Sequence, residues 1–400
     1  MSIKMKLKEI ANVEMGQSPD SNYVFEYDDL AMPFLQGNAD FGDISPSPQF
    51  YCSKPLKQAQ TGDILISVRA PVGAVNLADQ SYCIGRGLAA IRPKNSHISS
   101  KLFQNIISAN KQSLIRVAQG STFEAISKND LLEMDIYVPE SDLLQKIDNT
   151  LDVIEQTISQ TRIIIEKLNN KKQGLLNDLL TRGVNLHGNL RPSYEDAPDL
   201  YQETELGFIP KEWDISLLDD VATRGSGHTP NKNVPSYWNG GVKWVSLADS
   251  SKLDQIHISE TDKEISYLGI QNSSAVMHSK GTVVLSRDAG IGKSAILTDD
   301  MAVSQHFMAW KCSKRLNNYF LYYWLQQDKP VFENIAIGST IKTIGLPFFK
   351  TYKIAVPSIS EQEKVSAILL DTDKYLSDEV NKLNKLEKVK IGLLKDLLQN

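Results

Sequence analysis

Cysteine, histidine and long apolar runs are scarce in this 400-residue chain, and each shortage excludes a class of protein. The three cysteines, Cys52, Cys83 and Cys312, lie far apart without histidines at ligand spacing, so the sequence predicts neither a disulfide framework nor a zinc site. No apolar run reaches the roughly 20 residues of a membrane helix, and the N-terminus lacks a signal-peptide core. We therefore expect a cytoplasmic protein with buried or unreactive thiols and no bound metal.

Signatures of catalysis are also missing. The six histidines show no triad-like context, and no Gly-x-Gly-x-x-Gly follows a strand, so a Rossmann-type pocket is not supported. Residues 289–294 superficially resemble a phosphate-binding loop, but Arg287 stands where that loop needs its first glycine. We interpret this segment as a tight turn, or as a turn that presents Arg287 and Lys293 to phosphates. The sequence predicts no catalytic residues.

One group of carboxylates could be mistaken for a metal-dependent nuclease site. These residues lie on a stretch with helical periodicity, and we interpret them as a solvated helix face. They are Glu361, Glu363, Asp371 and Asp373.

The most informative feature present is an internal repeat. Residues 174–180 return as 392–398, and the same spacing of 218 relates 136–139 to 354–357. Nearer the start of each copy, the pattern of residues 62–73 recurs at residues 281–292. We align 84–87 with 304–307 and expect Arg69 and Arg287 at matching turns. A duplicated unit of this size predicts two similar domains related by a pseudo-two-fold axis, and duplex DNA is a partner of matching symmetry.

Each half combines strand and helix signals. Short apolar runs bounded by turns, such as 62–68 and 134–139, predict strands, and helical patches are expected at 100–107 and 318–325. The predicted fold class is α+β, with two similar mixed α/β domains separated by a long antiparallel two-helix coiled coil. The predicted segments are domain 1 at 1–140, long helix 1 at 141–183, a linker at 184–212, domain 2 at 213–358 and long helix 2 at 359–400.

Both predicted helices carry the same heptad seam, which is typical of a coiled coil. The apolar seam positions are Ile147, Leu151, Ile154, Ile158, Ile165, Leu168, Leu175 and Leu179, then Val365, Leu369, Leu376, Leu383, Leu386, Leu393 and Leu397. Polar residues share the seam at Thr161 with Glu379 and at Lys172 with Lys390. Each helix would be about 60 Å long, so we expect the pair to separate the two domains.

The net charge of −5 argues mildly against a nucleic-acid partner. However, the acidic excess of about −5 lies within residues 191–217. The rest of the chain is near neutral, which is compatible with a basic surface on each domain.

Polar, aromatic and basic residues occur in loops at matching places of the two halves. Such side chains read base edges and hold phosphates, and those that differ between the copies would read different sequences. The candidate DNA-binding residues of the first half are Gln17, Ser18, Asn22, Tyr23, Gln36, Asn38, Arg69, Arg86, Gln119, Ser121 and Thr122. Those of the second half are Arg224, His228, Thr229, Asn231, Lys232, Tyr237, Trp238, Arg287, Lys293, Gln305, His306, Ser339, Thr340 and Lys342.

Several segments carry a resemblance to a known family. They are 84–93 (IGRGLAAIRP), 120–122 (GST), Val138-Pro139, Val356-Pro357 with Glu361-Gln362, 207–213 (GFIPKEW) and the leucine-rich helix ends. With the repeat, they resemble the specificity subunit of type I restriction-modification systems over essentially the whole chain. The first copy departs from the pattern, with Leu143-Leu144 where the second has Glu361-Gln362.

The resemblance implies a DNA-binding subunit that is not itself an enzyme and holds no cofactor. Its two target recognition domains would each bind one half of a bipartite asymmetric double-stranded DNA sequence. It would dock two methyltransferase subunits, which bind S-adenosylmethionine, and restriction subunits. Two alternatives stay open: a DNA methyltransferase or nuclease with an unrecognised active site, and a structural coiled-coil protein.

Overall fold

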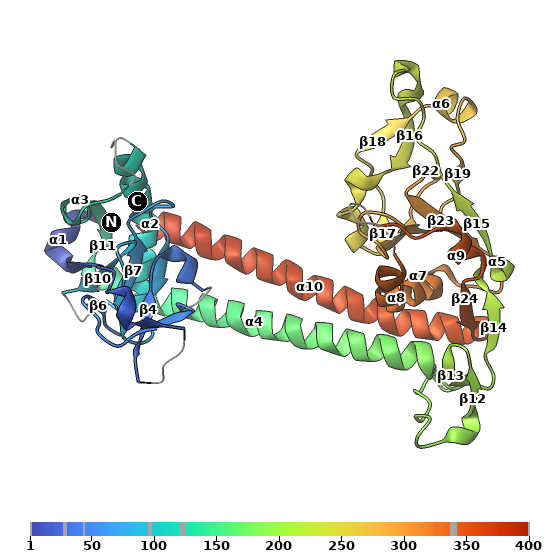
Figure 1. The fold of residues 1–400 in the computed structure, drawn as a ribbon, viewed down its shortest axis with the longest axis horizontal. Helices are drawn as coiled ribbons and strands as arrows, with labels where there is room; N and C mark the ends of the chain where they lie inside the picture. Colours follow the sequence, from blue (N-terminus) through green and yellow to red (C-terminus); the bar gives the residue numbers. More distant parts are fainter. Residues whose placement is uncertain are drawn as a thin grey trace. The chain divides into compact units, whose positions relative to one another are not determined.

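The computed structural model describes residues 2–26, 30–42, 45–94, 98–119, 125–336 and 342–398. The chain divides into two compact units, Met1–Ile163 with Val380–Asn400, and Ile164–Glu379. Each unit therefore contains one mixed α and β domain together with part of each long helix (Figure 1). In the described part of the chain, every helix is too short or too polar to cross a membrane.

The first domain contains two sheets and a separate strand pair. Its strands are β1 (Ser2–Lys6), β2 (Ala11–Met15), β3 (Val24–Phe25), β4 (Met32–Leu35), β5 (Phe50–Cys52), β6 (Gln58–Ala59), β7 (Ile64–Ser67), β8 (Val75–Leu77), β9 (Tyr82–Ile84), β10 (Leu88–Pro93) and β11 (Asp135–Pro139). One sheet has the order β2-β10-β7-β8 and the other the order β3-β5-β4-β9-β6, while β1 pairs with β11. Between the described strands of this domain, the pairings are antiparallel except β4 with β9.

The second domain repeats most of this topology, with one more strand in one sheet and one fewer in the other. Its strands are β14 (Asp214–Leu217), β15 (Ala222–Ser226), β16 (Trp238–Val245), β17 (His257–Ile258), β18 (Lys263–Ile265), β19 (Met277–His278), β20 (Val283–Ser286), β21 (Ser294–Leu297), β22 (Met301–Val303), β23 (Phe307–Cys312) and β24 (Lys353–Val356). The sheet orders are β15-β23-β20-β21-β17 and β18-β16-β22-β19, and β14 pairs with β24. The parallel pair β4–β9 has its counterpart in β16–β22. The predicted internal repeat is confirmed.

The central strands are buried on both faces, which explains their continuous apolar runs. In β7, Ile64 and Ile66 pack into one core with the domain's helices, whereas Leu65 packs into a second core between the two sheets. In β20, Val283 and Val284 divide in the same way between two cores. Because successive side chains of a strand point to opposite faces, one strand contributes to both cores. Burial of each such side chain stabilises the fold by about 1.5–3 kcal/mol.

The helical patches predicted at 100–107 and 318–325 are confirmed as parts of longer helices, and the domains contain further helices that were not predicted. The first domain has α1 (Leu7–Ile10), α2 (Ser100–Gln119) and α3 (Lys128–Leu132), and the second has α5 (Leu218–Val221), α6 (Tyr267–Gln271), α7 (Asn318–Gln327), α8 (Lys329–Ile335) and α9 (Leu346–Lys350). Short 3-10 helices are η1 (Ser21–Tyr23), η2 (Asn38–Asp40), η3 (Pro198–Leu200), η4 (Pro235–Tyr237), η5 (Leu247–Asp249) and η6 (Lys252–Asp254). The counterpart of α2 is split into α7 and α8, because Pro330 has no N–H to continue the helix.

The two long helices are α4 (Ser141–Thr181) and α10 (Ile359–Leu398). They run antiparallel in the first unit, where Glu155 pairs with Lys390 at 2.7 Å and Arg162 pairs with Glu387 at 2.8 Å. The fold class predicted from the sequence is confirmed in its two similar mixed domains, internal repeat and antiparallel helices.

Every apolar seam residue whose side chain is described is buried or half-buried. Leu151, Leu179 and Leu369 are nearly inaccessible, at 2%, 2% and 0%. The side chain of Leu397 lies outside the described residues. The seam residue Thr161 is also buried, and its hydroxyl donates to Thr157 O at 2.8 Å, which satisfies the polar group within its own helix.

The two seam lysines form equivalent ion pairs across the helices. Lys390 pairs with Glu155 at 2.7 Å, and Lys172 pairs with Asp373 at 2.5 Å. Adding 218 to Glu155 and Lys172 gives Asp373 and Lys390, so the repeat maps one pair onto the other. We call each pair a seam lock. These charges fix the register of the antiparallel helices, because a shift along the seam would leave half-buried charges unpaired.

Each seam lock also attaches the helix pair to its domain. Glu155 accepts from Lys101 of α2 at 2.7 Å, and Asp373 accepts from the hydroxyl of Tyr323 on α7 at 2.8 Å. Burial acts to raise the pKa of Glu155, but hydrogen bonds from Lys101 and Lys390 outweigh it and hold that pKa below its usual value. The Glu155 carboxylate is therefore stabilised in its charged form.

The linker contains a hairpin and a buried ion pair. The hairpin pairs β12 (Tyr201–Thr204) with β13 (Gly207–Pro210). Arg191 and Glu361, which are 7% and 8% exposed, form a bidentate ion pair. The Glu361 carboxylate also accepts from Val184 N at 2.9 Å and from the indole of Trp213 at 3.2 Å. We call this group the linker clamp, and it ties the linker to the start of α10.

The linker clamp and one seam lock show that the prediction of a solvated carboxylate face was wrong for two residues. Glu361 and Asp373 do not lie on a solvated helix face, because both carboxylates are paired with cations in largely buried positions. Glu363 and Asp371 are exposed, as predicted. The sequence pattern of the helix could not reveal the difference, because Arg191 reaches Glu361 from a distant part of the chain.

Candidate nucleic-acid interface

Three loops of the first domain are joined through their backbones. The loops comprise residues 16–18, 36–38 and 85–87. Gln17 N donates to Ile84 O at 2.9 Å, and Gly85 N donates to Leu35 O at 2.8 Å. A Cβ on Gly16 would clash with the carbonyl oxygen of Gly85, so the close approach of these loops requires glycine. We call them the first loop cluster.

The second domain brings its equivalent loops together with the same bonds. The loops comprise residues 227–229, 246–249 and 304–306. His228 N donates to Val303 O at 3.1 Å, and Ser304 N donates to Val245 O at 2.8 Å. A Cβ on Gly227 would clash with Val303 O, as at Gly16. This second loop cluster therefore has the same backbone frame as the first.

The backbone bonds correct the predicted alignment of the copies by one residue. Val68 N donates to Gly87 O at 2.9 Å, and Arg287 N donates to His306 O at 3.0 Å. Residues 84–87 therefore correspond to 303–306, not to 304–307, and Arg69 corresponds to Asp288. Arg69 and Arg287 lie at matching turns but not at equivalent positions. Sequence similarity is too weak in these loops to fix the alignment, whereas the hydrogen-bonded frame does so.

Polar side chains in the second loop cluster form a continuous hydrogen-bonded row. The hydroxyl of Thr229 lies 2.6 Å from Oε1 of Gln305, and Nε2 of Gln305 lies 3.3 Å from Nε2 of His306. Nδ1 of His306 contacts the carboxylate of Asp288, which also accepts from the hydroxyl of Thr343. The structure thus brings the predicted residues Thr229, Gln305 and His306 together. Sequence analysis missed Asp288 and Thr343, which carry no recognisable motif.

The first loop cluster holds different side chains in the same frame. Arg86 occupies the position of Gln305, and both its backbone N–H and its Nε lie 3.4 Å from the hydroxyl of Ser18. Ser18 is the counterpart of Thr229. Gln17, Gln36 and Arg86 are exposed, and Asn38 is half-buried in η2 beside them. Four predicted residues of the first half therefore lie in this cluster along with Ser18.

The predicted aromatic residues Tyr23 and Tyr237 lie in the 3-10 helices η1 and η4, and Trp238 begins β16. Lys54 Nζ stands 4.2 Å from the ring centroid of Tyr23 and donates to its hydroxyl at 3.1 Å. Trp238 donates through its indole to Asn231 O at 3.2 Å and packs edge-on against Trp244. The predicted residues Asn22, His228, Asn231 and Lys232 are exposed, and Tyr237 is half-buried.

Several predicted phosphate contacts are engaged by the protein itself. Arg224 pairs with Asp219 at 3.2 Å, Lys293 pairs with Asp254 at 2.7 Å, and Arg287 Nε donates to Ile344 O at 3.0 Å. These three cations are half-buried, which leaves them less available to a ligand than sequence position suggested. Arg69 and Lys342, by contrast, are exposed.

Some predicted residues cannot be placed. Ser121, Thr122, Ser339 and Thr340 lie outside the described residues, and so does the side chain of Gln119 at the end of α2.

A cavity of 490 Å³ in the second domain is lined by basic residues, one of which the sequence analysis did not identify. Lys293 and Lys342 line it as expected candidates, and Lys329 at the start of α8 joins them. The acids that line it are Asp288 and Glu333. No sequence signal singled out Lys329, because its position depends on the break between α7 and α8.

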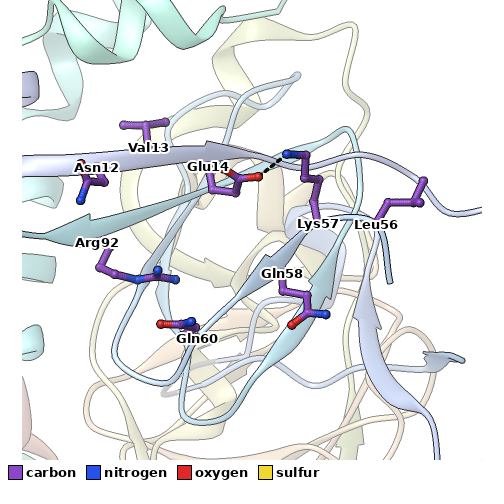
Figure 2. A pocket seen from close by; sticks show the side chains of 8 residues that line it. All are labelled: Asn12, Val13, Glu14, Leu56, Lys57, Gln58, Gln60 and Arg92. Carbon is purple, nitrogen blue, oxygen red and sulfur yellow. Dashed lines mark ion pairs between the residues drawn. The ribbon is translucent and has the colours of Figure 1, made fainter. Parts of the chain in front are cut away.

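A cavity of 330 Å³ in the first domain marks a second difference between the copies. Figure 2 shows it beside the ion pair of Lys57 with Glu14, whose atoms lie 2.5 Å apart. In the second domain Gly225 replaces Glu14, and the ring of His278 packs where a Cβ of Gly225 would stand. Burial lowers the pKa of His278, because the uncharged ring is favoured there.

The chain matches the family model described as "Type I restriction modification DNA specificity domain" over residues 3–170 and 210–390. The type I restriction enzyme MjaIX specificity subunit of Methanocaldococcus jannaschii is 29% identical over 199 residues, which are 49% of this chain and 46% of that protein. A protein of the same organism, assigned as the MjaX specificity subunit, is 40% identical over 167 residues, 42% of this chain and 39% of that protein. These matches span less than half of either relative.

A solved structure has the same fold across nearly its whole length. The crystal structure of a type I restriction-modification system S subunit from M. genitalium superposes with a TM-score of 0.60 at 15% identity, covering 100% of this chain and 96% of that chain. With both copies of the repeat inside the matched regions, the chain belongs to the type I restriction-modification DNA specificity family, a family of recognition subunits rather than of enzymes.

Proposed function

We propose that this protein is the non-catalytic DNA-specificity subunit of a type I restriction-modification enzyme. Target recognition domains at 1–140 and 213–358 would each bind one half of a bipartite, asymmetric double-stranded DNA sequence. Two methyltransferase subunits would supply S-adenosylmethionine chemistry, and restriction subunits would join the complex. The predicted DNA-binding residues belong to this proposal.

One observation supports it above all: two loop clusters share a backbone frame and differ in side chains. Ser18 and Arg86 in the first correspond to Thr229 and Gln305 in the second. A protein that reads two unlike half-sites needs this combination, because base edges are distinguished by side-chain donors and acceptors. Shared glycines maintain the frame, and the side chains between them are free to vary.

The test is selection of DNA from a random duplex pool by the full chain assembled with its methyltransferase subunits, at fixed salt. We expect enrichment of two short unlike motifs with a constant gap. Enrichment of a single uninterrupted motif, or of none, would overturn the proposal. Salt must be held constant, because phosphate contacts make affinity strongly salt-dependent.

A second measurement separates this function from the alternative of a methyltransferase with an unrecognised active site. Calorimetry of the isolated chain with S-adenosylmethionine should show no binding, whereas the assembled complex should bind it. Tight binding by the isolated chain would favour the alternative.

Exposed apolar residues away from the seam support the docking of partner subunits on the helices. On α4, Val153 is 63% exposed, and on α10 Val389 and Ile391 are 50% and 67% exposed. A partner subunit packed against the outer faces of the helices would cover these side chains. Val389→Asp should weaken co-purification with the methyltransferase subunit, and Lys388→Gln at the adjacent exposed position is the matched control.

A further inference from the structure

The hydrogen-bonded row in the second loop cluster orients the amide of Gln305. Asp288 can only accept, so the proton that it shares with His306 lies on Nδ1 of the imidazole. In the neutral ring Nε2 is then an acceptor, and the amide nitrogen of Gln305 donates to it at 3.3 Å. At the other side, the hydroxyl of Thr229 donates to the amide oxygen at 2.6 Å. The amide is held at both of its polar atoms.

This arrangement leaves Gln305 with a defined set of free groups. A primary amide has two N–H donors and two oxygen lone pairs, and the row uses one of each within the described residues. One N–H and one lone pair therefore stay available on an exposed side chain. An adjacent donor and acceptor match the major-groove edge of adenine, whose N7 accepts and whose N6 amino group donates.

The equivalent position of the first loop cluster carries a different set. Arg86 is also exposed, and the hydroxyl of Ser18 accepts from its Nε at 3.4 Å. Its two terminal nitrogens are without other partners among the described residues. Two parallel N–H donors match guanine, whose O6 and N7 both accept.

We propose that Gln305 reads an adenine in the half-site of the second domain and that Arg86 reads a guanine in the half-site of the first. The inference rests on the proposed function and deepens it. Thr229, His306 and Asp288 are positioning residues that hold the amide of Gln305, and Ser18 has this role for Arg86. A pre-oriented amide loses less rotamer freedom when the base is bound, so the row increases discrimination.

The experiment is the DNA selection described above, repeated with variants of the full chain in its complex. Gln305→Arg should change the preferred base from A to G at one position of one half-site. Gln305→Ala should remove the preference at that position, on the order of ten-fold. The reciprocal Arg86→Gln should change G to A at one position of the other half-site. Gln255→Ala, at an exposed glutamine in the same domain as Gln305, should leave both half-sites unchanged.

The positioning role has its own readout. Thr229→Val should weaken the preference for adenine at the same position without changing which base is preferred, and Thr229→Ser should restore it. In every variant, the unaltered preference of the other half-site shows that the protein is folded and bound.

The possible failures are distinguishable. If the parent protein selects no gapped motif, the proposed function fails. If the parent selects one but Gln305→Arg leaves every position unchanged, or converts a base other than adenine, the inference on Gln305 fails and the proposed function stands.

Discussion

The two domains share a topology but stabilise it differently. The seam locks are equivalent, yet Glu155 accepts from two lysines while Asp373 accepts from Lys172 and the Tyr323 hydroxyl. Among the described residues the linker clamp has no counterpart in the first copy, where Leu143 stands at the position equivalent to Glu361. The duplicated backbone frame therefore tolerates different buried polar groups, provided that each group is satisfied locally.

The largest expected effect comes from removing the difference at the linker clamp. Glu361→Leu copies the first repeat but leaves the buried Arg191 without its main counter-charge. We expect the unit of residues 164–379 to lose about 3–5 kcal/mol of unfolding free energy. Hydrogen exchange measured by peptide should locate the loss there. The control Leu143→Ala, at a 39% exposed side chain, should change stability by less than about 0.5 kcal/mol.

A smaller effect is expected where the copies exchange a small and a large residue. Gly225→Glu places the residue of the first domain against the ring of His278 and should cost about 1–3 kcal/mol through overpacking. His278→Ala, which copies Ala59, should restore much of that stability in the double variant. Thermal unfolding of both single variants and of the double variant tests whether the two substitutions compensate each other. If the losses of stability in the single variants simply add in the double variant, they do not.

The seam locks should respond unequally to loss of their interhelical lysine. Lys172→Met leaves Asp373 with one neutral donor, the Tyr323 hydroxyl, in a largely buried site. We expect this variant to lose about 1–3 kcal/mol of unfolding free energy. Lys390→Met leaves Glu155 its ion pair with Lys101 and should cost only about 0.5–1 kcal/mol. Denaturant unfolding of the two variants, with hydrogen exchange measured in each unit, compares their losses of stability. Equal losses would show that the domain-side partners are interchangeable.

The smallest effect is a pH dependence confined to the second domain. The folded state lowers the pKa of His278 below its ordinary value of 6.5, so below that pH the unfolded chain binds the proton more readily. The stability contributed by the neutral ring is full above pH 6.5 and is lost as pH falls through the lowered pKa, by at most about 1.4 kcal/mol per pH unit. Hydrogen exchange at pH 7.5 and 5.5 should show this loss around 225 and 278. His278→Ala should abolish it, and the region around Ala59 should not show it.

The regular elements were the most predictable part of the molecule. The heptad seam predicted both long helices, because apolar residues at a 3.5-residue period have one helical arrangement that buries them together. Strands within 62–68 and 134–139 and helices within 100–107 and 318–325 were likewise indicated by local pattern. These elements depend on neighbouring residues in the sequence.

The candidate site was predicted less completely. Thr229, Gln305 and His306 were identified as candidates, but their partners Asp288 and Thr343 were not, since three separate loops must meet to form the row. Arg224, Arg287 and Lys293 were predicted to be available cations and instead contact acids or carbonyl groups of the protein. Residue type alone does not indicate which charge is already neutralised.

The sequence by itself determined that this protein is built twice, with two mixed domains and two helices that share a seam, because repetition and periodicity are local properties of the chain. Only the tertiary structure decided which polar residues face each other. The Arg191–Glu361 pair, the seam locks and the row around Gln305 join residues that are distant in sequence or lie in different loops, and their partners are chosen by the backbone hydrogen bonds that bring those segments together.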